Sequence, residues 1–111
     1  MNTIWKYELQ ITDVQTLSVP SGAFPLKVGI QKRTVDPPDE LPEGWAYYPV
    51  EDEVPVIWMK VNPDLTPVDV VVRIVGTGHS FDPDKLWYVG TFQQQQRSSE
   101  FVGHVFMEAG L

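Results

Sequence analysis

Apolar and polar residues alternate along most of this chain, and this period of two is the pattern of β-strands with one buried face. No long stretch carries the 3.6-residue period of an amphipathic helix. The alternation predicts strands at residues 5–11, 17–19, 26–30, 54–61, 68–75, 86–92 and 100–107. Since apolar strand faces must cover each other, we expect an all-β fold, a small antiparallel β-sandwich or barrel of seven or eight strands with at most one short helix.

Turn signals between the strands predict which of them pair. Asp13 separates the first two strands, and we expect these to form a hairpin. The last two strands flank the polar connector 93–99 and are expected to form an antiparallel hairpin. The segment 80–85 is predicted as a loop with at most one helical turn after Asp82.

Alternation also predicts the core. In the strand at 68–75, the side chains of Val68, Val70, Val72 and Ile74 are expected to face inward, and those of Asp69 and Arg73 outward. Seven aromatic residues on predicted strands are expected in the core: Trp5, Tyr7, Trp58, Tyr88, Phe92, Phe101 and Phe106.

Length and charge limit the class of protein. The 111 residues suit one domain, so we expect residues 1–111 to fold as a unit. The net charge of −7 disfavours direct binding to nucleic acid, because phosphate neutralisation needs clustered Lys and Arg. The absence of cysteine excludes disulfides, thiolate metal sites and cysteine nucleophiles.

The start of the chain carries Lys6 and Glu8 where a secretion signal would be apolar, and no apolar run approaches the ~20 residues that span a bilayer. We therefore expect a cytoplasmic protein with no membrane partner. Unpaired strand edges favour a homo-oligomer.

Residues 34–53 interrupt the alternation. This stretch holds four prolines and seven carboxylates but no Lys or Arg, so it is predicted to be a long acidic loop inserted in the domain, with a short strand near residues 45–48. A solvated loop is the simplest interpretation. The functional alternative is an acidic surface for a basic partner.

The sharpest local motif is Gly76-Thr77-Gly78-His79, at the end of a hydrophobic strand. Glycines there permit positive φ or close approach to a ligand, and free N–H groups could hold an anion. The segment lacks the GxxxxGK[ST] pattern, and no long helix follows it. The alternative is a tight turn that leaves His79 exposed.

Catalytic and metal-binding patterns are weak. His79 and His104 with Asp82 and Asp84 do not have the spacing of metal ligands, and no serine lies in a GxSxG motif. We therefore expect neither an enzyme nor a bound metal or other cofactor. His104 is expected to be half-buried on a strand, and Arg73 to pair with Asp69 or another neighbour.

Five segments occur in an order that resembles a family of small bacteriophage and prophage proteins: IWKYELQITDVQTLSVPSGA, VIWMKVNP, VRIVGTGHSFD, YVGTF and FVGHVFME. The resemblance covers residues 3–33 and 54–108, whereas residues 34–53 depart from it. It implies a phage origin and marks as family-like the positions Gly76, Thr77, Gly78, His79, Tyr88, Gly90, Thr91 and His104. Such a mixture of glycines and hydrogen-bonding side chains suits a ligand pocket.

The first functional hypothesis is a counter-defence factor that sequesters a nucleotide-type host immune signal without breaking a bond. Strand ends would line the pocket, an arginine would neutralise phosphate and an aromatic ring would stack on a base. The candidate ligand-binding residues are Arg73, Gly76, Thr77, Gly78, His79, Trp87, Tyr88, Thr91, Arg97 and His104.

Two alternatives belong to other classes. An acidic inhibitor would present residues 36–53 as a mimic of nucleic acid to a basic host nuclease or defence effector. A minor virion or assembly component would instead use the sheets as a structural unit.

Overall fold

Seven strands form two antiparallel sheets in the computed structural model, which describes residues 1–35, 44, 50–96 and 99–108. The strands are β1 (Thr3–Glu8), β2 (Val14–Pro20), β3 (Phe24–Val35), β4 (Val50–Val61), β5 (Pro67–Gly76), β6 (Leu86–Gln96) and β7 (Ser99–Glu108). No helix occurs within these ranges. The prediction of an all-β fold with seven or eight strands is thus confirmed.

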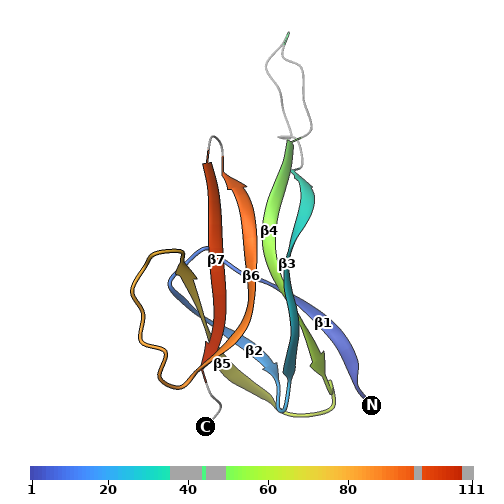
Figure 1. Cartoon of the computed structure of the whole chain (residues 1–111). Coiled ribbons are helices and arrows are strands. Elements are labelled where there is room, and N and C mark those ends of the chain that lie inside the picture. The colour runs from blue at the N-terminus through green and yellow to red at the C-terminus, as the bar shows by residue number, and fades with distance from the viewer. Residues whose placement is uncertain (36–43, 45–49, 97–98, 109–111) are drawn as a thin grey trace.

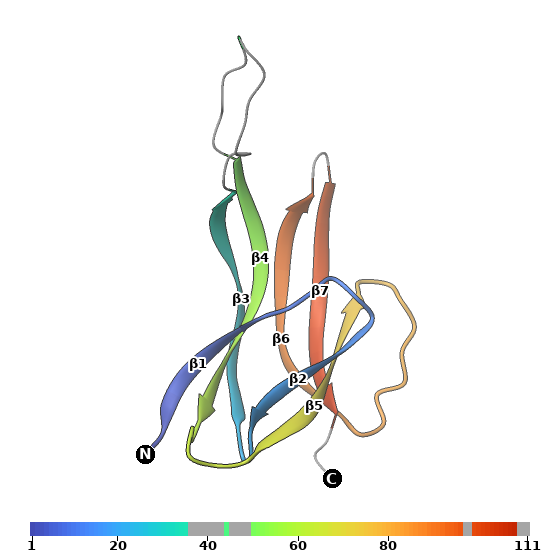
Figure 2. The same ribbon diagram turned by 180° about the vertical axis from the view of Figure 1, so that it is seen from behind.

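The sheets stack as two layers of a sandwich (Figures 1 and 2). One sheet has three strands in the order β1-β4-β3, and the other has four in the order β2-β5-β7-β6. Strands β3 and β6 lie side by side where the two sheets meet (Figure 1). There the added Cβ of an alanine at Gly90 would lie only 3.0 Å from Cβ of Val28, so a glycine favours this close approach of the two strands.

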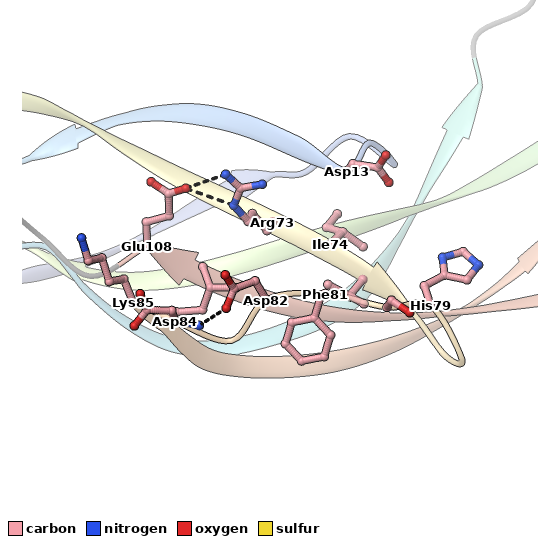
Figure 3. A pocket seen from close by; sticks show the side chains of 12 residues that line it. Asp13, Arg73, Ile74, His79, Phe81, Asp82, Asp84, Lys85 and Glu108 are labelled. Atoms are coloured by element: carbon pink, nitrogen blue, oxygen red, sulfur yellow. Dashed lines mark hydrogen bonds and ion pairs between the residues drawn. The ribbon is translucent and has the colours of Figure 1, made fainter.

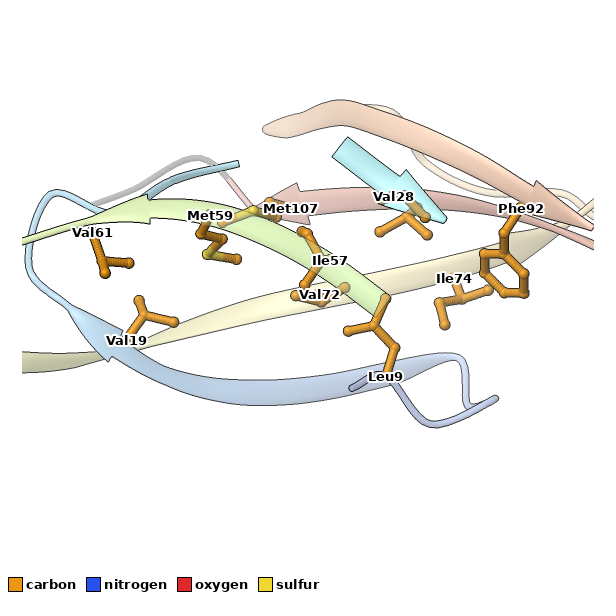
Figure 4. Packing of buried hydrophobic residues seen from close by; sticks show 11 residues of the cluster. Leu9, Val19, Val28, Ile57, Met59, Val61, Val72, Ile74, Phe92 and Met107 are labelled. Carbon is orange, nitrogen blue, oxygen red and sulfur yellow. The ribbon is translucent and has the colours of Figure 1, made fainter. Parts of the chain in front are cut away.

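The core fills the space between the sheets with aliphatic side chains (Figure 4). Ile57 and Met59 of β4 meet Val72 and Ile74 of β5, and each sheet contributes further residues around them. Val72 and Ile74 are buried as predicted, but Val68 is exposed because it lies near the start of β5, at the end of the sandwich.

Strand order dictates an unusual connection after β5. β5 and β6 each pair antiparallel with β7, which lies between them, so they run in the same direction. The chain between them, residues 77–85, must therefore cross β7 on one face of the sheet. This crossover lies over the outer face, because the inner face is filled by the core.

The predicted hairpin of the first two strands is wrong. β1 pairs with β4 and β2 pairs with β5, so the two strands lie in different sheets. The amide of Leu9 donates to the Pro55 carbonyl, and the Asp13 carbonyl accepts from Ile74 N–H, so the linker passes from one sheet to the other. β1 and β2 each form the edge of a sheet. There each pairs with a strand that is longer than the other would be as a partner, β1 with β4 and β2 with β5.

Three loop boundaries also differ from prediction. β3 continues to Val35 and β4 begins at Val50, so strands take both ends of the expected acidic loop; residues 36–43 and 45–49, with the short strand expected there, lie outside the described residues. The glutamines at 93–96 belong to β6, since their backbones pair with β7. After Asp82 the chain makes a turn, Leu86 N–H to Pro83 O, and no helix.

Four of the aromatic residues predicted in the core lie elsewhere, and Phe106 is one of them, because it lies on the outer face of β7. Trp5 lies opposite the buried Met59 but is 43% exposed because β1 is an edge strand, and Tyr88 is exposed because it lies on the outer face of the four-stranded sheet. Trp58 alternates with the buried Ile57 and Met59 and therefore packs on the outer face of the three-stranded sheet, against Gly29.

Candidate functional site

The outer face of the four-stranded sheet gathers most of the family-like positions. In the pairing of β6 with β7, Thr91 lies opposite His104 and Tyr88 opposite Phe106. On the other side of β7, Val75 lies opposite His104. The inner face of β7 is taken by buried Gly103, Val105 and Met107, so its even-numbered residues face outward.

A chain of hydrogen bonds runs across this face with His104 at its centre. His104 Nε2 lies 2.8 Å from Thr77 Oγ1, and His104 Nδ1 lies 2.9 Å from Thr91 Oγ1. The Tyr88 hydroxyl lies 2.6 Å from the same Thr91 oxygen. A neutral imidazole donates at one nitrogen and accepts at the other, so the four side chains form one continuous network.

The glycine motif is a turn that holds one end of this network. His79 N–H donates to the Gly76 carbonyl at 3.0 Å, and Gly78 has a φ of 87°. A glycine in the third position of such a turn permits this conformation without strain. The turn uses the His79 amide itself and directs the Thr77 hydroxyl to His104, so these groups fix the backbone instead of remaining open for an anion.

The rest of the crossover is fixed by two further turns and an aromatic contact. Asp84 N–H donates to the Asp82 carboxylate at 3.0 Å, and Leu86 N–H donates to the Pro83 carbonyl at 3.1 Å. The rings of Phe81 and Phe106 lie 5.0 Å apart between centroids. Phe81 thereby packs the middle of the crossover against β7.

A pocket of about 740 Å³ opens between the crossover and the sheet (Figure 3). His79 lies at one end, and Lys85 and Asp84 lie at the other. The charged or titratable side chains of its lining are Asp13, Arg73, His79, Asp82, Asp84, Lys85 and Glu108. The pocket lining thus contains four carboxylates and only two side chains that are always cationic, Arg73 and Lys85.

Arg73 is held in this pocket by an ion pair with the end of β7. Its Nε and Nη2 atoms donate to Glu108 Oε1 at 3.0 and 2.7 Å. Both side chains are about two-fifths exposed, so solvent reaches the pair. Arg73 faces outward as predicted, with Glu108 as its partner and not Asp69.

The predicted site residues divide into groups. Thr77, Tyr88, Thr91 and His104 form the network, whereas Gly76 and Gly78 shape the turn. Arg73 and His79 line the pocket. Trp87 is exposed but is not part of the pocket lining, and Arg97 lies outside the described residues.

Sequence reasoning missed residues that complete the pocket. Asp13 comes from the linker between the sheets, Glu108 from the end of β7, and Phe81 and Lys85 from the crossover. Local sequence offers no signal for this set, because strand order alone brings the segments together. The pairing of Phe81 with Phe106 depends on the same order.

No group of three or more His, Asp or Glu in the described part of the chain is placed to hold a metal ion. Within the described ranges, no helix is long and apolar enough to cross a membrane.

One family model matches the chain. It is described as a domain of unknown function (DUF7352), and the match extends over residues 1–110. Comparison with curated proteins and with solved structures gives no match. The match spans the whole described structure, including the network and the pocket.

Proposed function

The chain belongs to this family of unknown function, and we propose from its site that it is a small phage-encoded binding protein that sequesters a nucleotide-type host immune signal without turnover. The observation that carries the proposal is the pocket beneath the crossover. Its volume of about 740 Å³ lies within the ~300–1,000 Å³ typical of small-molecule sites. A stacking surface and cationic groups border it.

The groups around the pocket match the parts of a nucleotide. Phe81 and Tyr88 both pack against Phe106, which gives an aromatic cluster with exposed rings on which a base can stack. Arg73 and Lys85 can meet a phosphate. The carboxylates can accept hydrogen bonds from ribose hydroxyls and base amino groups.

The charged side chains of the pocket limit the class of ligand that it can bind. Since four carboxylates face Arg73 and Lys85, a ligand with several terminal phosphates would be repelled. A ligand of low charge with many hydroxyl and amino donors, such as a cyclic or linked nucleotide, is favoured. Its phosphate competes with Glu108 for Arg73.

Sequestration without turnover is supported by the surroundings of His104. Both of its ring nitrogens contact threonine hydroxyls, and neither contacts a carboxylate that would orient it as a general base. The network is a means of fixing the crossover and Tyr88 in place.

Titration calorimetry with a panel of linear and cyclic nucleotides tests the proposal, with chromatography of the ligand after incubation. Binding should raise the stability of the folded state by about 2.7 kcal/mol at a hundredfold excess over the dissociation constant. Phe81→Ala and Arg73→Gln should each weaken binding. Lys27→Gln, a cation on the other sheet, is the matched control and should not. A panel without any binding, or a ligand that is consumed, would overturn the proposal.

A second candidate is binding to a basic host protein, favoured by the same excess of carboxylates in the pocket. A lysine or arginine of the partner would enter the pocket in place of the nucleotide. This candidate predicts that an arginine-rich peptide binds in a salt-dependent manner and that Asp82→Asn with Asp84→Asn abolishes binding. The nucleotide proposal predicts that these two substitutions preserve or improve phosphate binding.

A further inference from the structure

The charges of the chain are divided unevenly between the two outer faces of the sandwich. The net charge of −7 is a sum over all residues. On the four-stranded sheet, the pocket lining contains more carboxylates than cations. On the three-stranded sheet, three of the chain's five lysines lie on the outer face: Lys6, Lys27 and Lys60. Among the side chains described on that face, at residues 4–8, 24–31 and 54–60, Glu8 is the one carboxylate.

Strand register places these lysines on one face. Met59 of β4 points into the core, so its neighbours Trp58 and Lys60 point outward. Lys6 of β1 and Lys27 of β3 lie opposite Trp58 from its two sides and therefore share its face. All three lysines are exposed, so they form a cationic surface on a chain that is acidic overall.

Lysines and apolar side chains alternate across this surface, which we call the lysine face. Two neighbouring rows across the strands form it: Lys6, Trp58 and Lys27 in one row, and Ile4, Lys60 and Phe24 in the next. Phe24 is 52% exposed and Trp58 is partly buried. Each lysine therefore lies next to an aromatic residue, and Lys60 Nζ is 5.9 Å from the centroid of the Phe24 ring.

The spacing of the lysines suits a chain of anionic groups. Neighbouring strands lie ~4.8 Å apart and residues advance ~3.4 Å along a strand, so the three lysine Cα atoms lie roughly 8–10 Å from one another. Lys6 Nζ donates to Gln31 Oε1 across β4. An ammonium group has several N–H donors, so this bond leaves others for an anion. One extended anionic chain can thus contact all three side chains.

We propose that the lysine face binds single-stranded nucleic acid without sequence preference. Such binding needs cations for the phosphates and accessible rings on which bases stack, and both lie here within two rows. A duplex keeps its bases stacked inside, so it offers only its phosphates to this face. An acidic polypeptide offers charges but no base for each ring. The alternation of cations with aromatic residues therefore favours a single strand.

The lysine face is separate from the site beneath the crossover. The two lie on the outer faces of different sheets, on opposite sides of the core (Figures 1 and 2). A single nucleotide has one base and cannot reach the whole lysine face, whereas an oligonucleotide can. The proposal is therefore tested with an oligonucleotide, and its outcome does not depend on the nucleotide pocket.

Fluorescence anisotropy of a labelled oligothymidylate of about 12 nucleotides, titrated with the full chain over a series of salt concentrations, tests the charges. The slope of log K against log salt is about −0.7 for each phosphate neutralised on a single strand, so three lysines should give about −2. Lys27→Gln and Lys60→Gln should each weaken binding and bring the slope closer to zero by about 0.7. Lys32→Gln is the matched control, because Lys32 lies on β3 as well but, by alternation, on its opposite side. It changes the net charge equally and should leave the slope unchanged.

The aromatic part of the surface is tested by Phe24→Ala. This variant should weaken oligothymidylate binding at least ~5-fold, because a stacked base is lost, and should leave the salt slope unchanged. Phe81→Ala is its control, since Phe81 is 46% exposed but lies on the outer face of the other sheet. It should retain oligothymidylate, although the proposed function predicts that it loses the nucleotide. Circular dichroism checks that each variant is folded.

Four results would overturn the proposal. The first is no binding of oligothymidylate at low salt, and the second is equal affinity for a duplex of the same length. The third is binding that both lysine variants leave unchanged. The fourth is tighter binding of polyglutamate or of anionic vesicles, lost in Lys27→Gln, which would assign the lysine face to an acidic protein or a lipid surface. Each of these results would leave the proposed nucleotide pocket standing.

Discussion

The outer faces of the two sheets differ in what lies over them. The face of the four-stranded sheet is crossed by residues 77–85, which border a pocket and add Thr77 to the hydrogen-bonded network of Tyr88, Thr91 and His104. The face of the three-stranded sheet has no such cover among the described residues. There Trp58 lies over Gly29, and Lys6 and Lys27 flank it in register.

Chain connection explains this difference. β3 and β4 are antiparallel neighbours, so no crossing of the sheet face is required between them. β5 and β6 are parallel and are separated by β7, which comes later in the chain, so their connection has to pass over the face. A pocket on one face and an open surface on the other follow from strand order, although both sheets have the same alternating sequence pattern.

Two glycines allow the packing of the sheets to be compared directly, and here we expect the largest effect. A Cβ at Gly103, on the inner face of β7, would lie 2.5 Å from the Phe92 ring and 3.0 Å from Ile74. Gly103→Ala should lower the free energy of unfolding by about 1–3 kcal/mol, because buried Phe92 has to leave its position. Denaturant unfolding measures the change.

Gly29→Ala is the matched variant in the other sheet. Its Cβ would lie 3.1 Å from the edge of Trp58, which is only partly buried on an outer face and can shift. We expect a loss below 1 kcal/mol. Equal losses at the two positions would contradict the view that the three-stranded face is the more open one.

The second prediction concerns the turn at residues 76–79, where the crossover begins. Gly78 has a φ of 87°, and an alanine in the left-handed region costs about 1–2 kcal/mol. Gly78→Ala should destabilise the chain by that amount and also weaken ligand binding, because the turn carries Thr77 to His104. Ser80→Ala, at an exposed position in the same crossover, should have little effect on stability, which makes it the control.

Part of this site could be predicted from sequence. Alternation identified the strand that carries Arg73 and Val72, and the glycines identified a turn after it. Two kinds of information were missing. β1 and β2 lie in different sheets because each pairs with a strand more than 40 residues away. The hydrogen bond between Thr77 and His104 depends on β7 lying between β5 and β6. Local pattern describes a strand's two faces but not its neighbours.

The third prediction concerns the inner side of the three-stranded sheet. The hydroxyl of Tyr7 is buried without a hydrogen-bond partner, and burial raises the pKa of this phenol. Tyr7→Phe should raise the free energy of unfolding by about 1 kcal/mol, because it removes an unsatisfied polar group. Tyr88→Phe, which removes a bonded hydroxyl, should not increase stability.

The raised pKa of Tyr7 also predicts the direction in which stability changes with pH, and this can be tested. Below about pH 10, the ordinary pKa of tyrosine, the phenol is neutral in both states and contributes no pH dependence. Above it the unfolded chain loses the proton first, so the wild type loses stability as the pH rises towards the folded-state pKa. The advantage of Tyr7→Phe over the wild type should therefore be constant near neutrality and grow above about pH 10. A constant difference throughout would argue against burial of the phenol.

The smallest effect is expected at the ion pair of Arg73 with Glu108. Because both side chains are about two-fifths exposed, solvent screens the pair, and we expect it to contribute only about 0–1 kcal/mol to stability. A double-mutant cycle of Arg73→Gln and Glu108→Gln measures this coupling. The two variants should have opposite effects on ligand affinity. Arg73→Gln loses the phosphate partner and should weaken binding, whereas Glu108→Gln frees Arg73 and should tighten binding. A pair that stabilises strongly but leaves binding unchanged would make Arg73 a structural residue of the four-stranded face, and the pocket would then have to bind through its carboxylates.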